Sequence, residues 1–299
     1  MIIKQGEQGT EQWHIDRAGV ITASMFSEIR RVANGLDEKQ QAYVGLVQQG
    51  YSEKDAAELR SEEHTSELQS LHDALPISGY KAKPQSERIR RAINGEKVGE
   101  HTQSAQDYAF RTALERIRNY PLDQGYETWA MRWGKEQEVN ARFEHEQLLE
   151  TLIEPIGLVT TDCERFGASA DGLVGDDGGA EYKCFLDPAK IRTIVIDRDL
   201  AQFADQVQGG MWITGRQWWD FCLYCPALPE GGALQRFRFY RDEDYIAQLA
   251  SDLEDFDALV EYHRDRIIEA CASNGANISG VADTSTSAPA ASAEGIFQQ

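Results

Sequence analysis

Three side chains in the middle of the sequence have types and a spacing suited to metal-assisted hydrolysis. Asp171 stands in the segment GASADGLV, and Glu181 and Lys183 follow in AEYKC with the pattern Asp-x₉-Glu-x-Lys. Carboxylate oxygens are ligands that Mg²⁺ and Mn²⁺ prefer, and an amine beside them can orient or deprotonate water or stabilise developing charge. The pattern is compatible with a hydrolytic site but is weak on its own, because a hairpin with exposed Asp, Glu and Lys produces it more often.

The surrounding segments predict a β-hairpin that brings these residues together. The stretch 175–179, rich in Gly and Asp, is typical of a turn between two short strands. Because side chains alternate along a strand, Glu181 and Lys183 share one face and Tyr182 points to the other. The hairpin then places Asp171 beside them. The strands predicted in this half of the chain span residues 157–161, 165–169, 173–174, 180–184, 218–224 and 235–240.

Helices are expected before, between and after these strands. Residues 128–152 form the strongest helical stretch, which Pro155 is expected to end. Four of its apolar side chains are available for burial, namely Met131, Val139, Phe143 and Leu149. Apolar residues at every third or fourth position predict a long helix with one buried face over 242–270. Further helices are expected over residues 11–17, from 22 or 24 to about 31, and over 199–214.

The composition is that of an ordinary enzyme with an acidic surface. The 299 residues include 30 Lys and Arg against 50 Asp and Glu, for a net charge of −20, and 41% are hydrophobic. No run approaches the roughly 18 apolar residues of a membrane span, and the first residues lack a signal peptide's apolar stretch. We expect neither a membrane nor a secreted protein, and five scattered cysteines favour a reduced, cytoplasmic location. The acidity argues against a protein that coats nucleic acid with its whole surface, but not against a nuclease.

Residues 79–118 are locally basic, with nine Lys and Arg against five acidic residues. Such a cluster is compatible with a surface that faces DNA and equally with a solvated helix face. The sequence leaves both interpretations open.

Residues 60–78, RSEEHTSELQSLHDALPIS, interrupt the chain with a segment of unusual origin. RSEEHTSELQS resembles the conceptual translation of a common sequencing-library adapter, and LHDALPIS resembles that of its paired adapter. We infer an assembly artefact that encodes no evolved structure; the alternative is a Ser- and Glu-rich surface loop. Resequencing the source DNA from an adapter-free library is expected to lose these codons, and their recovery would refute the artefact.

Four sequence blocks, in this order, resemble the YqaJ-like phage recombination exonucleases of the lambda exonuclease family. The blocks are WHIDRAGVITAS, WGKEQEVNARFEHE, GASADGLV with EYKC, and QVQGGMWITGRQWWDF. The resemblance implies the PD-(D/E)xK nuclease fold, an α/β (α+β) architecture with a mixed central sheet flanked by helices. Blocks on both sides of residues 60–78 suggest that both flanks belong to the same gene type. Ala170 and Phe185 stand where proline is common in the family, which leaves the ligands intact.

The resemblance also implies roles for nine residues. The catalytic set is Glu138, Asp171, Glu181, Lys183 and Gln206. The metal ligands are Glu138, Asp171, Glu181 and the backbone carbonyl of Tyr182. The pocket that grips the 5′-phosphate contains Arg17, Ser24 and Ser169, and an Arg with hydroxyls suits a phosphate because charge-assisted hydrogen bonds are directional. Spacing alone does not separate Glu138 from its competitors Glu136, Glu144 and Glu146.

The activity implied by the resemblance is that of a Mg²⁺-dependent 5′→3′ exonuclease, with Mn²⁺ as a substitute and two ions per site. It would degrade one strand of double-stranded DNA from 5′-phosphorylated ends, which leaves 3′ overhangs for phage-type recombination. The implied partners are DNA ends, further copies in a homotrimer, and a phage single-strand annealing protein in the bacterial cytoplasm. The alternatives are a PD-(D/E)xK endonuclease or repair nuclease, and an inactive DNA-end-binding protein.

On this interpretation the chain has four parts. Residues 1–59 are the N-terminal helical part of the nuclease domain, and residues 60–78 are the suspected artefact. Residues 79–272 are the nuclease core with its long C-terminal helix. Residues 273–299 are small and polar, which predicts a disordered tail.

Overall fold

A five-stranded mixed sheet is at the centre of the fold, seen in a computed structural model that describes residues 1–57, 87–123 and 128–278. The strand order is β11-β10-β9-β8-β5, with β9 and β10 parallel and the other pairs antiparallel. These strands are β5 (Ile153–Glu154), β8 (Gly172–Val174), β9 (Gly178–Lys183), β10 (Trp218–Tyr224) and β11 (Leu234–Tyr240). The expected mixed sheet is confirmed, whereas the suspected artefact at 60–78 lies outside the described residues.

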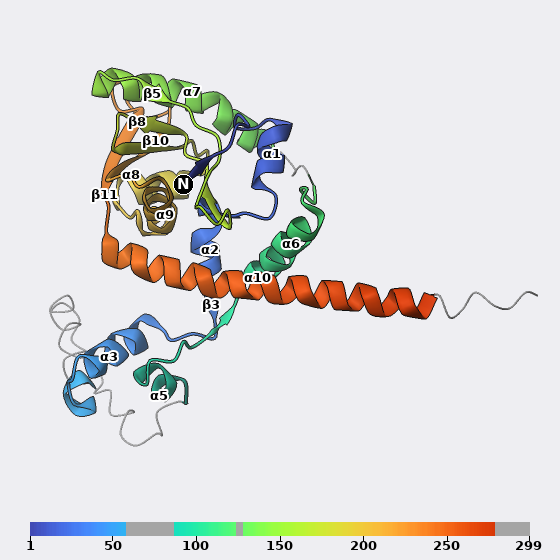
Figure 1. The fold of residues 1–299 in the computed structure, drawn as a ribbon. Helices are drawn as coiled ribbons and strands as arrows, with labels where there is room; N and C mark the ends of the chain where they lie inside the picture. The colour runs from blue at the N-terminus through green and yellow to red at the C-terminus, as the bar shows by residue number, and fades with distance from the viewer. Residues whose placement is uncertain (58–86, 124–127, 279–299) are drawn as a thin grey trace, which may run out of the picture.

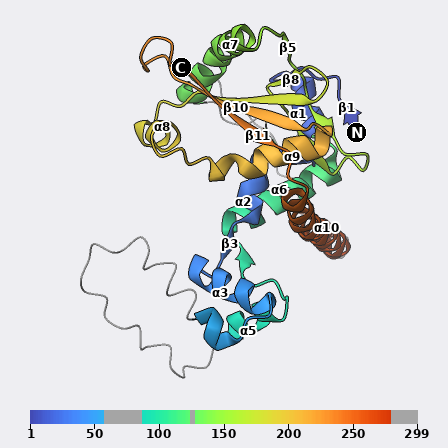
Figure 2. The same cartoon turned by 90° about the vertical axis from the view of Figure 1, so that its left-hand side faces the viewer.

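Helices cover both faces of this sheet (Figures 1 and 2). On one face, Tyr182, Cys222 and Tyr224 pack in a cluster with Ala141 of α7 (Trp129–Leu149). On the other face, buried side chains of β10 pack against α8 (Pro188–Val195) and α9 (Ala204–Thr214). The alternation of side chains along β9 and β10 therefore gives the sheet two different faces.

A pair of glycines allows β9 to lie flat against its parallel neighbour β10. A Cβ atom on Gly178 would lie 2.1 Å from Cζ2 of Trp218, and one on Gly179 would lie 2.3 Å from Cε3 of Trp219. Any larger residue would collide with an indole ring, because real Cβ atoms do not approach ring carbons so closely. The glycines thus fix the start of the strand that carries Glu181.

A second, four-stranded sheet joins the N-terminal segment to the region after the suspected artefact. Its order is β1-β6-β7-β2, with β2 (Ile21–Thr22) parallel to β7 (Phe166–Ala168). The other two strands are β1 (Ile2–Ile3) and β6 (Val159–Thr160). The helix expected over residues 11–17 is α1 (Glu11–Arg17), which Thr10 caps. Both flanks of residues 60–78 therefore contribute to one folded unit.

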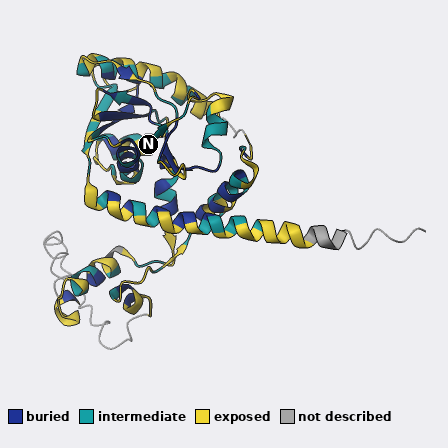
Figure 3. Ribbon diagram, viewed as in Figure 1, coloured by how far each residue is buried: buried dark blue, intermediate teal, exposed yellow. Residues whose placement is uncertain are grey.

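The long helix α10 (Glu243–Ile278) crosses beneath this unit and packs on α6 (Gln103–Arg118) and α2 (Phe26–Arg30), which follows the short 3₁₀ helix η1 (Ala23–Met25) (Figure 1). Its expected apolar stripe is buried at Ile246, Leu249, Leu253, Phe256 and Val260. The far end of α10 is exposed (Figure 3). The helix reaches Ile278, beyond its expected end at residue 270, so the first residues assigned to the tail are helical.

A small helical appendage projects from the body on a two-stranded ribbon (Figures 1 and 2). The ribbon pairs β3 (Val32–Ala33) with β4 (Glu100–His101), and the appendage contains α3 (Glu38–Gln48) and α5 (Glu87–Ile93). Its own apolar cluster consists of Tyr43, Val44, Ala56, Ile89 and Ala92. The residues on either side of the undescribed stretch 58–86 belong to this appendage, away from both sheets.

The structure corrects two expectations about helices. Met131, Val139 and Phe143 of α7 were expected in the core but are exposed, while Ala141 and His145 are buried. The reason is that α7 turns a partly polar face to the sheet. The helix also ends at Leu149 with a left-handed Glu150, before Pro155, and α8 is a helix that no local pattern indicated.

Candidate active site

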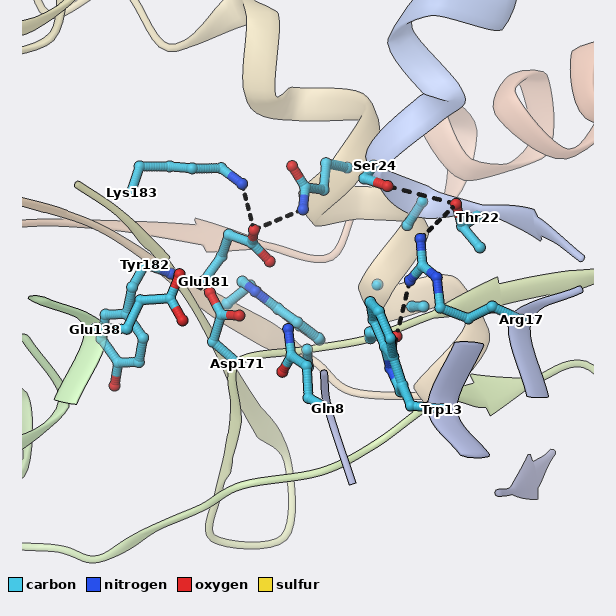
Figure 4. Close-up of a pocket in the computed structure, with 17 residues that line it drawn as sticks. Gln8, Trp13, Arg17, Thr22, Ser24, Glu138, Asp171, Glu181, Tyr182 and Lys183 are labelled. Atoms are coloured by element: carbon cyan, nitrogen blue, oxygen red, sulfur yellow. Dashed lines mark hydrogen bonds and ion pairs between the residues drawn. The ribbon is translucent and has the colours of Figure 1, made fainter. Parts of the chain in front are cut away.

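The predicted hairpin is formed by β8 and β9, and it brings Asp171 and Glu181 together. Gly172 lies opposite Ala180 in the antiparallel register, so Asp171, just before β8, lies next to Glu181. Gly175 makes the turn with a φ of 53°, a left-handed conformation that suits glycine. Lys183 projects from the same face of β9 as Glu181 (Figure 4). The placement expected from the alternation is what the structure shows.

Each carboxylate of this hairpin has a defined hydrogen-bond partner. The Lys183 ammonium and the Gln206 side-chain amide both donate to Oε1 of Glu181, each at 2.6 Å. The backbone N–H of Tyr182 donates to Oδ2 of Asp171 at 2.7 Å. Gln206 lies on α9, so this helix and β9 together orient the Glu181 carboxylate.

The electrostatics of this cluster show an excess of negative charge. Burial, followed by the charges of Glu181 and Glu138, raises the pKa of Asp171 well above its ordinary value. Burial of Lys183 works against its charged form, but Glu181 and Asp171 outweigh that effect and raise its pKa. Lys183 is therefore an ammonium suited to donate hydrogen bonds and to balance negative charge, rather than a ready proton acceptor.

Glu138 is the acidic residue of α7 that reaches this cluster. Burial and the neighbouring charge of Glu181 raise the pKa of Glu138. Of the four acids that spacing left open, Glu138 lines the pocket, whereas Glu136 is exposed and Glu146 accepts a hydrogen bond from the backbone of Ile153. The structure thus places Glu138 where the sequence block assigned it.

A second cluster, formed by a guanidinium and hydroxyls, lies on the other side of the same pocket (Figure 4). Arg17 donates to the Ser169 hydroxyl at 3.0 Å and to the Thr22 hydroxyl at 3.2 Å, and Ser24 lies 3.4 Å from Thr22 between their hydroxyl oxygens. Trp13 donates from its indole to Ser169, and the guanidinium lies 4.4 Å from its ring centroid. Among the described residues, no carboxylate forms an ion pair with Arg17.

Burial has a clear effect on this guanidinium. It lowers the pKa of Arg17 and outweighs the opposing effects of Tyr108 and Glu115. The group still remains charged at neutral pH, since arginine does not lose its proton in proteins. A half-buried cation that faces hydroxyls is an arrangement suited to an anion such as a phosphate.

All nine residues singled out from the sequence line one pocket with a cavity volume of about 210 Å³. The further residues that line it include Gln8, Trp13 and Thr22, to which sequence reasoning assigned no role. Trp13 and Thr22 belong to the block WHIDRAGVITAS, so the signal was present but was attributed only to Arg17 and Ser24. Gln8 precedes that block, and nothing local distinguishes it.

The residues of the carboxylate cluster fit a divalent cation by their chemistry. They offer only oxygen ligands, and burial followed by the charges of neighbouring carboxylates raises the pKa values of Glu138 and Asp171. In the described part of the chain, no three His, Cys, Asp or Glu side chains form a group that could hold a metal ion as they stand. The donor atoms are of a suitable kind, while the carboxylates of Asp171 and Glu181 accept hydrogen bonds from the Tyr182 N–H, Lys183 and Gln206.

Several basic residues of the segment 79–118 neutralise acids of the protein itself. Arg116 pairs with Asp257 and Glu261 of α10, and Arg111 pairs with Glu115 and Asp123. Lys97 pairs with Asp252 and Asp255, and Arg91 pairs with Glu96. This part of the sequence therefore contributes to the packing of α6 and α10 through its charges.

A mixed sheet between helices, with carboxylates and a lysine on a central hairpin, defines an α/β protein of nuclease-like architecture. Residues 88–217 match the family model of the YqaJ-like viral recombinase domain. This stretch is thus similar to a YqaJ-like viral recombinase domain, in agreement with the resemblance drawn from the sequence blocks. The match includes Glu138, Asp171, Glu181 and Lys183, while the block with Arg17 precedes it.

The solved structures that match this chain include exonucleases. The alkaline exonuclease LHK-Exo from Laribacter hongkongensis, alone and in complex with dAMP, is 23% identical with a TM-score of 0.58, over 88% of this chain and 99% of that chain. A phage-related exonuclease from Haemophilus somnus 129PT is 15% identical with a TM-score of 0.43, over 64% and 91%. None of the curated proteins matches this sequence. No helix of the described residues is long and apolar enough to cross a membrane.

Proposed function

We propose that the protein is a Mg²⁺-dependent deoxyribonuclease that degrades one strand of double-stranded DNA in the 5′→3′ direction from 5′-phosphorylated ends. The observation that carries this proposal is that one pocket holds both the carboxylate–lysine cluster and the Arg17 cluster. The first is suited to phosphodiester hydrolysis and the second to a terminal phosphate. The YqaJ-like domain and the fold shared with an alkaline exonuclease give further support.

The proposed mechanism assigns a task to each group. Glu138, Asp171 and Glu181, with the carbonyl of Tyr182, would hold divalent cations, with Mn²⁺ as a substitute for Mg²⁺. Cations in such sites neutralise phosphate charge and activate water. Lys183, as an ammonium, would orient the attacking water and stabilise the negative charge that develops on the phosphate. Gln206 would keep the Glu181 carboxylate in one orientation through its hydrogen bond.

The Arg17 cluster would select the DNA end. Its guanidinium and the hydroxyls of Ser24 and Ser169 can surround a 5′-phosphate with directional hydrogen bonds. A terminus held in this way presents its first phosphodiester to the carboxylates of the same pocket. Hydrolysis from 5′ ends would leave a 3′ overhang, the substrate of phage-type recombination.

The polarity and the need for an end are tested with three DNA substrates in Mg²⁺. Linear duplex with 5′-phosphates should be degraded fast, linear duplex with 5′-hydroxyls more slowly, and closed circular duplex not at all. Nicking of the circle would identify an endonuclease instead. Binding of ends without degradation of either linear duplex would identify an inactive DNA-end-binding protein. EDTA should stop the reaction, and added Mg²⁺ should restore it.

We also propose the assembly and partners that the resemblance implies. A homotrimeric ring around DNA would keep the enzyme on its substrate, and a single-strand annealing protein would load onto the overhang in the bacterial cytoplasm. A solution mass three times the 33.6 kDa of the chain is expected. A monomeric mass at micromolar concentration would contradict the ring.

A further inference from the structure

Tyr182 of β9 connects Glu181 and Lys183 with Asp171, and its side chain lies on the face of the strand opposite the pocket. It lies between Glu181 and Lys183 in the strand, and its backbone N–H holds the carboxylate of Asp171 at 2.7 Å. Its ring is buried against α7, with 2% of the residue exposed. A shift of Tyr182 would therefore move both neighbouring side chains and the hydrogen bond to Asp171.

The Tyr182 hydroxyl is engaged by a buried histidine. His145 on α7 is fully buried, and its Nδ1 lies 3.0 Å from the Tyr182 hydroxyl oxygen. The two rings meet edge to face at 84°, with centroids 5.8 Å apart. Arg142, on the same helix, donates a hydrogen bond of 3.1 Å to the backbone carbonyl of Asp171. Two polar side chains of α7 thus contact the hairpin: Arg142 binds Asp171, just before β8, and His145 binds Tyr182 of β9.

The histidine is in turn fixed by a buried carboxylate. Nε2 of His145 lies 3.1 Å from Oδ2 of Asp220 on β10, which is also fully buried. Arg238 donates two hydrogen bonds of 2.8 Å to Asp220, and Arg236 adds one of 3.3 Å. A carboxylate can only accept, so Nε2 carries a proton, while Nδ1 and the Tyr182 hydroxyl share a hydrogen bond.

We propose that His145 and Asp220 are positioning residues that set the metal affinity of the carboxylate cluster through the Tyr182 hydroxyl. Neither touches the pocket. A buried charged network rarely adds more stability than apolar packing would, so its value here is orientation. Partners behind the ligands of a metal site commonly change metal affinity or activity by about 10–100-fold when they are lost. This inference rests on the proposed function, since it concerns the same site.

Three substitutions test the connection. Tyr182→Phe removes one oxygen atom and leaves the ring. His145→Gln can keep the bond to Asp220 but withdraws the group facing Tyr182, whereas His145→Asn keeps a polar atom near the position of Nδ1. Tyr224→Phe is the matched control, because Tyr224 is a buried tyrosine of the same cluster that faces Glu144 instead.

The primary measurement is Mn²⁺ binding to the full chain without DNA, by electron paramagnetic resonance of free Mn²⁺. We expect Tyr182→Phe and His145→Gln to weaken binding about tenfold, and their double variant to bind no more weakly than either single variant. Tyr224→Phe should stay close to the wild type, and His145→Asn, which keeps a polar atom facing Tyr182 but loses the bond to Asp220, should bind Mn²⁺ with intermediate affinity. The Mg²⁺ concentration for half-maximal degradation of linear DNA should shift in the same order, and melting temperatures report whether each variant is folded.

Two results would overturn the inference. One is wild-type Mn²⁺ affinity in folded Tyr182→Phe. The other is an equal loss in His145→Asn and His145→Gln, which would show that the effect does not pass through the Tyr182 hydroxyl. If His145→Gln does not fold, Tyr182→Phe alone decides. Failure of the proposed function is distinguishable, because the wild type itself would then neither bind Mn²⁺ nor degrade linear DNA.

Discussion

Replacement of Asp171 by asparagine is expected to abolish hydrolysis of linear duplex DNA and to leave the metal-free protein at least as stable as the wild type. The buried carboxylate of Asp171 lies beside Glu138 and Glu181, and its charge is what a cation would bind. Without it we expect turnover to fall by about a thousandfold or more. The change is measured as the initial rate on 5′-phosphorylated DNA at saturating Mg²⁺.

The effect on stability has a separate physical reason. Burial and the neighbouring carboxylates raise the pKa of Asp171, which means that its charge is unfavourable while no cation is bound. Asparagine removes the charge and keeps an oxygen for the Tyr182 N–H, so that no buried donor loses its partner. In EDTA, the melting temperature of the variant should therefore equal or exceed that of the wild type.

The response of the melting temperature to added Mg²⁺ distinguishes the wild type from Asp171→Asn. A cation that binds only the folded state stabilises it by about 2.7 kcal/mol at one hundred times its dissociation constant. The melting temperature should rise with Mg²⁺ for the wild type and remain constant for Asp171→Asn. Asp176→Asn, in the exposed hairpin turn, is the control and should behave like the wild type. Loss of turnover that occurs only with loss of the folded state would contradict the assigned role.

Replacement of Arg17 by alanine is expected to erase the preference for 5′-phosphorylated ends. Hydrogen bonds to charged groups contribute about 1.5–3 kcal/mol, or roughly ten- to a hundredfold in rate. Ser169 keeps its hydrogen bond from the Trp13 indole in the variant, so the rest of the pocket should retain its shape. The ratio of initial rates on phosphorylated and hydroxyl-terminated duplexes, at subsaturating DNA, should therefore fall towards one.

Two control variants make this result specific. Arg17→Lys keeps a positive charge but loses the planar fork that donates to both Ser169 and Thr22, so its ratio should be intermediate. Arg192→Ala removes an exposed arginine of α8 and should leave the preference unchanged. If the wild-type ratio persists in Arg17→Ala, then Arg17 does not select the end.

The sequence predicted the hairpin well because its signals are local. Alternation fixes which face Glu181 and Lys183 share, and the glycine-rich turn fixes the register that places Asp171 beside them. The fold class followed from a family resemblance carried by four sequence blocks rather than from spacing. The roles of the nine residues remain predictions, although the structure brings all of them to one pocket.

What the sequence could not predict depends on contacts between distant segments. His145 and Asp220 meet only because the parallel pairing of β9 and β10 places Asp220 beneath α7. The same contact explains why α7 buries polar His145 and exposes Val139 and Phe143, which an apolar pattern assigns to the core. A hydrophobic periodicity cannot indicate a helix face that is selected by hydrogen-bond partners.

The two clusters of the pocket come largely from separate stretches of the chain. Arg17 and Ser24 precede the helical appendage, whereas Glu138, Asp171 and Glu181 follow it. On the proposed function, substitutions in one short N-terminal stretch would therefore alter which termini are accepted while the proposed hydrolytic groups are inherited unchanged. A lineage with this fold can diversify its substrates by small steps, and a protein engineer can graft a new end preference along the same route.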